Sequence, residues 1–200
     1  MNNRFAAIMV ALAVSIFAFP TISHAKRVHG VFRVVKGNVK IKTARGKIKR
    51  ARVGQKVFPK DTIITAKDSR AKIIMTDKNV INVSPASEVI FANYEYEPKK
   101  NKKNVLLNVI YGKVRSKVNQ KYDGKQSKFQ VKTPSAVAGV RGTDFFTSYN
   151  MQTRATNVVT FEGTVSYGLP AANGGILNAV AVKAGQMASN RAGQAPTPPR

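Results

Sequence analysis

Few side chains in this sequence could carry out acid–base or metal chemistry. Glu95 and Glu97 would share one face of a strand, and two carboxylates can hydrolyse a glycoside; the alternative is a solvated strand edge beside Pro98. His29 is the only histidine after residue 25, so no His-based metal cluster or catalytic triad can form. No Gly-x-Ser-x-Gly turn or glycine-rich phosphate loop is present. The sequence therefore predicts a protein that is not an enzyme and that binds no metal or cofactor.

Arg141 lies in an unusual setting, between Gly139 and Gly142 and two residues before Thr143. A guanidinium has five donors in a planar fork, so it can bind several carbonyls or one carboxylate bidentately. One interpretation is a structural clasp that ties strand ends together from within the fold. The other is a cation presented to an anionic ligand. The candidate carboxylate partners are Asp61, Asp77, Asp144 and Glu162.

Basic residues give a positive signal for binding. The formal net charge is +25, and two stretches concentrate it: Arg45, Lys47, Lys49, Arg50 and Arg52, then Lys99, Lys100, Lys102 and Lys103. Such patches attract polyanions such as lipopolysaccharide, acidic wall polymers or anionic lipid. The alternative is an ordinary solvated surface. Few aromatics lie among these lysines, so the stacking platform of a single-strand nucleic-acid binder is missing, and no nucleic-acid partner is expected.

The first 25 residues have the features of a secretory signal peptide. Arg4 precedes an apolar run from Phe5 to Phe19, and Ser23-His24-Ala25 predicts cleavage after Ala25. A retained anchor is the alternative, but this run is shorter than the ~20 residues that span a bilayer, and no later segment could span one. We therefore expect a periplasmic or secreted protein. With no cysteine, it can form no disulfide or thiolate metal site.

Short segments of alternating apolar residues, broken by turn signals, predict an all-β fold. Val39 and Ile41 alternate with lysines, and Phe129 and Val131 alternate with two lysines and Gln130. Separate strands are expected over 105–111 and 114–118. The expected organisation is one domain over 26–190, built as a β-sandwich or a rolled, solenoid-like stack of sheets. Residues 191–200 are proline-rich with little apolar content, which predicts a disordered tail.

The order of the turn motifs resembles a FecR domain, the periplasmic module of regulators that relay iron–siderophore signals. The resemblance covers about Val34 to Val165, and its markers are Lys60-Asp61, Asp77-Lys78-Asn79, Thr133-Pro134, Val140-Arg141-Gly142-Thr143 and Glu162-Gly163-Thr164-Val165. The family usually has Gly-Asp in place of Lys60-Asp61 and Asp-Gly-Ser in place of Asp77-Lys78-Asn79. A regulator of the iron-citrate type also carries an anti-sigma segment and a membrane helix, whereas this chain resembles stand-alone exported members.

The resemblance implies an envelope domain that binds or senses something, either an anionic polymer or an envelope protein. It also permits a signalling component that hands a stimulus to a separate membrane-bound regulator. An arginine found across the family favours the clasp for Arg141, with Glu162 as partner because Glu162-Gly163 forms the other turn of the pattern. Thr133 and Pro134 belong to the same predicted structural set. Arg141→Ala is then expected to unfold at a clearly lower temperature.

Overall fold

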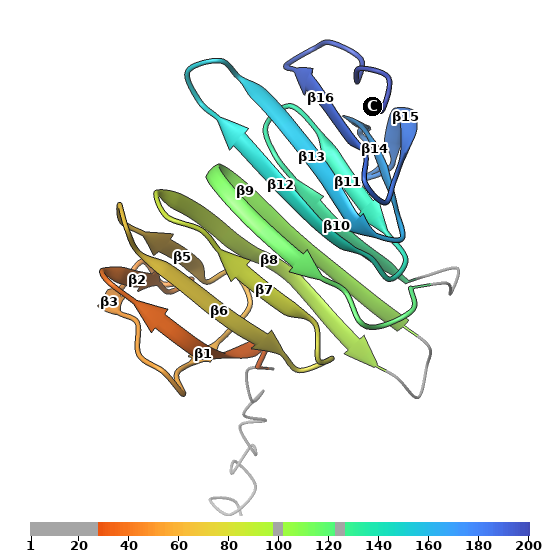
Figure 1. Ribbon diagram of the computed structural model, residues 1–200. Coiled ribbons are helices and arrows are strands. Elements are labelled where there is room, and N and C mark those ends of the chain that lie inside the picture. Colours follow the sequence, from red (N-terminus) through yellow and green to blue (C-terminus); the bar gives the residue numbers. More distant parts are fainter. Residues whose placement is uncertain (1–27, 98–101, 123–126) are drawn as a thin grey trace, which may run out of the picture.

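The computed structural model describes residues 28–97, 102–122 and 127–200. The predicted signal peptide, Lys99 and Lys100 lie outside these ranges. The described residues contain no helix, so none is available that could cross a membrane. The prediction of an all-β fold is confirmed, and the strands form two layers that share one long strand (Figure 1).

Each layer is a row of paired strands. The first layer contains, in spatial order, β4 (Lys56–Val57), β1 (Gly30–Lys36), β6 (Arg70–Met75), β7 (Val80–Val83), the second part of β9 (Lys102–Lys117), β12 (Asp144–Asn150), β13 (Ala155–Glu162) and β16 (Met187–Arg191). The second contains β3 (Ile48–Arg50), β2 (Val39–Lys42), β5 (Thr62–Thr65), β8 (Ser87–Glu97), the first part of β9, β10 (Lys128–Lys132), β11 (Val137–Val140), β14 (Thr164–Pro170) and β15 (Ile176–Lys183). Successive segments of the chain contribute strands to both layers, as in a rolled stack of sheets.

Strand β9 passes from the second layer to the first at Gly112. Tyr111 pairs with Glu88 of β8, whereas Gly112 pairs with Tyr149 of β12. Gly112 has φ 86°, and a Cβ there would lie 2.2 Å from the Ser87 hydroxyl, so only glycine permits this crossing. The two strands predicted over 105–111 and 114–118 are therefore one continuous strand.

The core lies between the layers and follows the predicted alternation. Val39, Ile41, Phe129 and Val131 are at most 1% exposed, while Lys40, Lys128 and Lys132 beside them are exposed and Gln130 is half-buried. Burial of such side chains stabilises a fold by about 1.5–3 kcal/mol each. The period-two pattern in the sequence thus identified the inner faces correctly.

The prediction of a disordered tail is wrong. The Thr197 and Arg200 amides donate to the carbonyls of Ser189 and Met187 at 2.7 and 3.0 Å, and the Met187 amide donates to the Arg200 carbonyl at 2.9 Å. Low apolar content was a poor guide because main-chain bonding to the open edge of β16 needs no apolar side chains.

Candidate functional site: the Arg141 groove

Arg141 is not the buried clasp that the sequence predicted. Its side chain is exposed and forms no hydrogen bond or ion pair with the described residues. Val140, the last residue of β11, points into the core, so strand alternation directs Arg141 outward. Its expected partner Glu162 is also exposed and lies 3.6 Å from Lys117 Nζ instead.

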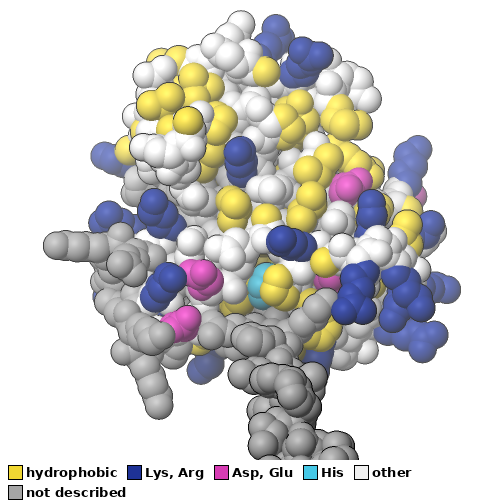
Figure 2. Space-filling model, turned by 180° about the vertical axis from the view of Figure 1, so that it is seen from behind, with side chains coloured by type: hydrophobic (Ala, Val, Ile, Leu, Met, Phe, Trp, Pro, Cys, Tyr) yellow, Lys and Arg dark blue, Asp and Glu magenta, His cyan; other side chains and the backbone are white. Residues whose placement is uncertain are grey.

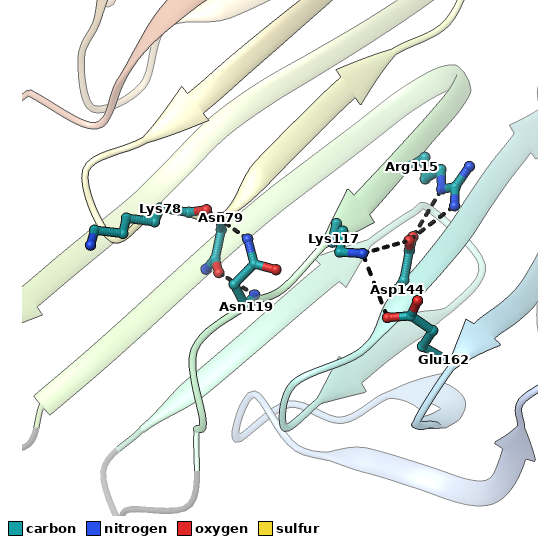
Figure 3. Close-up of polar contacts among 7 residues, drawn as sticks. All are labelled: Lys78, Asn79, Arg115, Lys117, Asn119, Asp144 and Glu162. Atoms are coloured by element: carbon teal, nitrogen blue, oxygen red, sulfur yellow. Dashed lines mark hydrogen bonds and ion pairs between the residues drawn. The ribbon is translucent and has the colours of Figure 1, made fainter.

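A different arginine forms the clasp. Arg115 on β9 donates from Nε and Nη2 to the two carboxylate oxygens of Asp144 on β12, each at 2.9 Å, and only 3% of the Asp144 side chain is exposed (Figure 3). These bonds raise the pKa of Arg115. The guanidinium also lies 4.4 Å from the centre of the Phe161 ring. Asp144 was one of the four candidate carboxylates, but the pairing of β9 with β12 places it against Arg115.

The glycines around Arg141 shape the turn without holding the arginine. Gly142 and Gly163 have φ 99° and 79°, and a Cβ on Gly163 would lie 2.9 Å from the Gly142 carbonyl. Thr143 Oγ1 donates to the Thr164 carbonyl at 3.2 Å. Gly139 lies within β11, where the Ile176 side chain covers it. The two motif turns therefore pack against each other through their backbones.

Thr133 has a structural role that the sequence only hinted at. Its hydroxyl lies 2.7 Å from Thr156 Oγ1 and accepts the Ala136 amide at 3.0 Å, and Ser135 Oγ lies 2.6 Å from the same Thr156 hydroxyl. All three hydroxyls are buried, so this network links the β10–β11 turn to β13. Pro134 is exposed and takes no part in it.

Arg141 borders a groove on the outer face of the second layer. We call it the Arg141 groove: its volume is about 630 Å³, and its lining includes Lys128, Gln130, Gly139, Arg141, Thr164 and Ser166. Gly139 pairs with Gln130 on β10 and with Ser166 on β14, so the middle strand of this part of the lining contributes no side chain at that position. Gln130 Nε2 donates to the Gly174 carbonyl at 3.2 Å, which holds the β14–β15 turn over one end.

Cations and hydroxyls line the Arg141 groove. Lys128 and Arg141 are both exposed, and Thr164 lies on the strand beside Arg141. No carboxylate is among the described residues that line it. Two cations near hydroxyl and amide donors can bind an anionic group such as phosphate or carboxylate.

The first predicted basic stretch lies apart from this groove. Arg45, Lys47, Lys49, Arg50 and Arg52 are exposed around β3, at the opposite end of the second layer (Figure 2 shows the scattered cations of the molecule's rear face). Lys102 is paired with Glu95 at 3.0 Å, and Lys103 Nζ donates to the Lys121 carbonyl at 3.4 Å. The two stretches therefore do not form one patch.

The carboxylates considered for hydrolysis are in β8. Glu95 is bound to Lys102, and no cavity described in the structure has Glu95 or Glu97 in its lining. Among the described residues, no three side chains of His, Asp or Glu gather as a metal site would require.

Two departures from the family motifs have a structural explanation. Lys60 and Lys78, which stand where the family has glycine, have φ 65° and 66°, in the left-handed region. The adjoining aspartates accept hydrogen bonds: Asp61 accepts the Phe58 amide at 2.9 Å, and Asp77 accepts the Tyr122 hydroxyl at 2.7 Å. Burial raises the pKa of Asp77.

The geometry defines a two-layer, all-β module in which paired turns support an open cationic groove. The family described as FecR protein matches residues 61–166, more than half of the chain, and its match begins at Asp61 rather than near Val34. This chain belongs to the FecR family. No curated protein matches it.

Two solved structures share the fold. Both are crystal structures of a candidate anti-sigma factor from Parabacteroides distasonis ATCC 8503, at 1.65 and 2.50 Å resolution, with TM-scores of 0.52 and 0.53. Each is 14% identical to this chain and is matched over 70% of this chain and 58% of its own length. The chain thus spans less than two thirds of those structures, and the likeness concerns the fold alone.

Proposed function

We propose that this FecR-family protein is an exported interaction module of the bacterial cell envelope that binds an anionic polymer through the Arg141 groove. The observation that carries the proposal is that Lys128 and Arg141 line the same groove, which has no described carboxylate in its lining. Because Arg141 has no partner among the residues that the structure describes, its guanidinium is available to a ligand. The predicted signal peptide and the high net charge support the envelope and the polyanion.

We also propose that the protein is not an enzyme. The groove contains no histidine, carboxylate or paired nucleophile and base among its described residues, and neither glutamate of β8 is in its lining. Binding through charges and hydroxyls needs none of these groups.

Retention on lipopolysaccharide and on purified wall fragments tests the proposal. We would compare the mature chain with Lys128→Gln/Arg141→Gln, and with Lys36→Gln/Lys67→Gln, which removes two exposed cations elsewhere. The groove variant is expected to bind at least tenfold more weakly at low salt, while the control changes little. Wild-type retention should fall at about 0.5 M salt. Equal binding by the two double variants would refute the role of the groove.

A signalling role is the second candidate. It is favoured by membership of the FecR family, and here a protein partner would receive a stimulus from this chain and pass it to a membrane-bound regulator. Cross-linking in the native envelope, followed by loss of the cross-link in the Arg141→Gln variant, would support it. A partner that still cross-links to that variant would have to contact another surface.

A further inference from the structure

The outer face of the first layer carries a second cleft, whose chemistry differs from that of the Arg141 groove. It lies where β9 crosses between the layers and has a volume of about 560 Å³. We call it the β12 cleft and define it by Tyr111, Lys113, Phe146, Ser148, Asn150 and Asn157. Met151 and Gln152, from the turn after β12, also line it.

Strand register places the polar side chains in a line across the cleft. Ser148 on β12 pairs with Lys113 on β9 and with Asn157 on β13. Asn157 Nδ2 lies 3.5 Å from Ser148 Oγ, at the limit of a hydrogen bond, so both groups retain bonding capacity. A ligand lying across the strands would meet these groups in succession.

The turn at the rim of the cleft is fixed by its own hydrogen bonds. Asn150 Oδ1 accepts the amides of Gln152 and Thr153 at 2.9 and 3.0 Å. This holds the turn that carries Gln152 and leaves the Asn150 amide nitrogen without a bond to any described residue. The rim is therefore shaped before a ligand binds.

Aromatic and amide groups dominate this lining. Tyr111 and Phe146 are partly exposed, Lys113 is the one cation, and no carboxylate is present among the described lining residues. Amides and hydroxyls donate and accept at once, as vicinal sugar hydroxyls do. Aromatic faces pack well against apolar C–H surfaces. Phosphate or a polyanion would need more cations than this cleft offers.

We propose that the β12 cleft binds a neutral oligosaccharide, with Tyr111 and Phe146 against pyranose ring faces and Ser148, Asn157 and the Asn150 amide bonded to hydroxyls. This site is separate from the Arg141 groove, so either can fail without the other. A cleft of this volume accommodates about two or three sugar units, given that ligand pockets commonly measure about 300–1,000 Å³.

Calorimetric titration of the mature chain with two defined trimers tests the proposal: a β-1,4-linked N-acetylglucosamine trimer and an α-1,4-linked glucose trimer. At least one should bind with a Kd that changes less than twofold between low salt and about 0.5 M salt. Tyr111→Ala and Asn157→Ala are expected to weaken that binding at least tenfold and fivefold. Preference between the trimers identifies the source of the sugar.

Matched controls come from the same outer face. Phe161→Ala removes an exposed aromatic and Asn82→Ala a half-buried amide, and neither residue is in the cleft lining. Both should bind within twofold of the wild type. Tyr111→Phe should keep ring packing and retain most of the affinity, which separates binding from folding. The proposal is overturned if neither trimer binds at millimolar concentration, or if the controls weaken binding as much as the cleft variants do.

Discussion

Removal of the Asn79 side chain should destabilise the protein strongly, although Asn79 is not in the lining of either proposed site. Asn79 is fully buried in the turn between β6 and β7. Its amide nitrogen donates to Asp77 Oδ2 at 2.8 Å and to the Tyr122 hydroxyl at 2.9 Å, and its oxygen accepts the amides of Asn119 and Gln120 at 2.8 and 3.4 Å (Figure 3 shows Asn79 and Asn119). It therefore joins this turn to the segment that follows β9.

The expected loss follows from those bonds. The bond to a carboxylate contributes about 1.5–3 kcal/mol, and each neutral bond about 1 kcal/mol. Asn79→Ala should thus lower the free energy of unfolding by about 4.5–6 kcal/mol, and the Tm by roughly 10–20 °C for a domain of this size. Denaturation in urea, followed by circular dichroism, measures the change. Asn82→Ala is the control, because the half-buried Asn82 side chain forms no hydrogen bond with a described residue.

A second variant separates the donor from the acceptor. Asn79→Asp keeps an oxygen for the Asn119 amide but loses the donor to Asp77 and brings two carboxylates together. Repulsion favours protonation of that pair in the folded state, so this variant should be less stable at pH 7 than at pH 5, relative to wild type. If Asn79→Ala proved no more harmful than Asn82→Ala, the assigned network would be wrong.

Other predictions concern single side chains. Arg115→Ala should lower the free energy of unfolding by about 2–3 kcal/mol, because it leaves the buried Asp144 carboxylate without its bidentate partner. Arg141→Ala should change that free energy by less than about 0.5 kcal/mol. Urea denaturation of both variants tests the reassignment of the clasp. Lys78→Gly should raise stability by about 1 kcal/mol in the same assay, because glycine adopts the left-handed backbone there without strain. Burial lowers the pKa of His29 from 6.5 to about 4. The fold favours the neutral form of His29, so the stability contributed by its burial should be fully present above pH 6.5 and fall as the pH drops toward 4. At pH 5 the free energy of unfolding should be lower by about 1–2 kcal/mol. The Tm, measured across this pH range, should fall less steeply in His29→Phe.

The parts of this fold that depend on local sequence could be predicted, and those that depend on distant pairing could not. Alternation identified Phe129 and Val131 as core residues because the side chains of a strand alternate between its two faces wherever the strand lies. The choice between Arg141 and Arg115 as the clasp needed the register of β9 against β12, which pairs Arg115 with Phe146 and Lys117 with Asp144. No spacing in the sequence gives that register.

The same distinction explains why the sequence indicated Arg141 but not the β12 cleft. Arg141 was noticed because glycines flank it, although those glycines serve the turn and not the arginine. The β12 cleft was missed because its members come from three strands and are ordinary when read singly: Tyr111, Ser148 and Asn157 lie in separate segments. Only pairing places them side by side.

The two lysine departures show which part of a family motif the fold requires. At both turns the aspartate makes the hydrogen bonds, through Asp61 to the Phe58 amide and through Asp77 to Asn79 and Tyr122. The neighbouring position requires only a positive φ, which glycine adopts freely and lysine adopts at a cost of about 1–2 kcal/mol. A change from glycine to Lys60 or Lys78 therefore weakens each turn without altering its hydrogen bonds, whereas loss of either aspartate would remove them. The two lysines therefore amount to a modest loss of stability at turns whose hydrogen bonds are made by the aspartates.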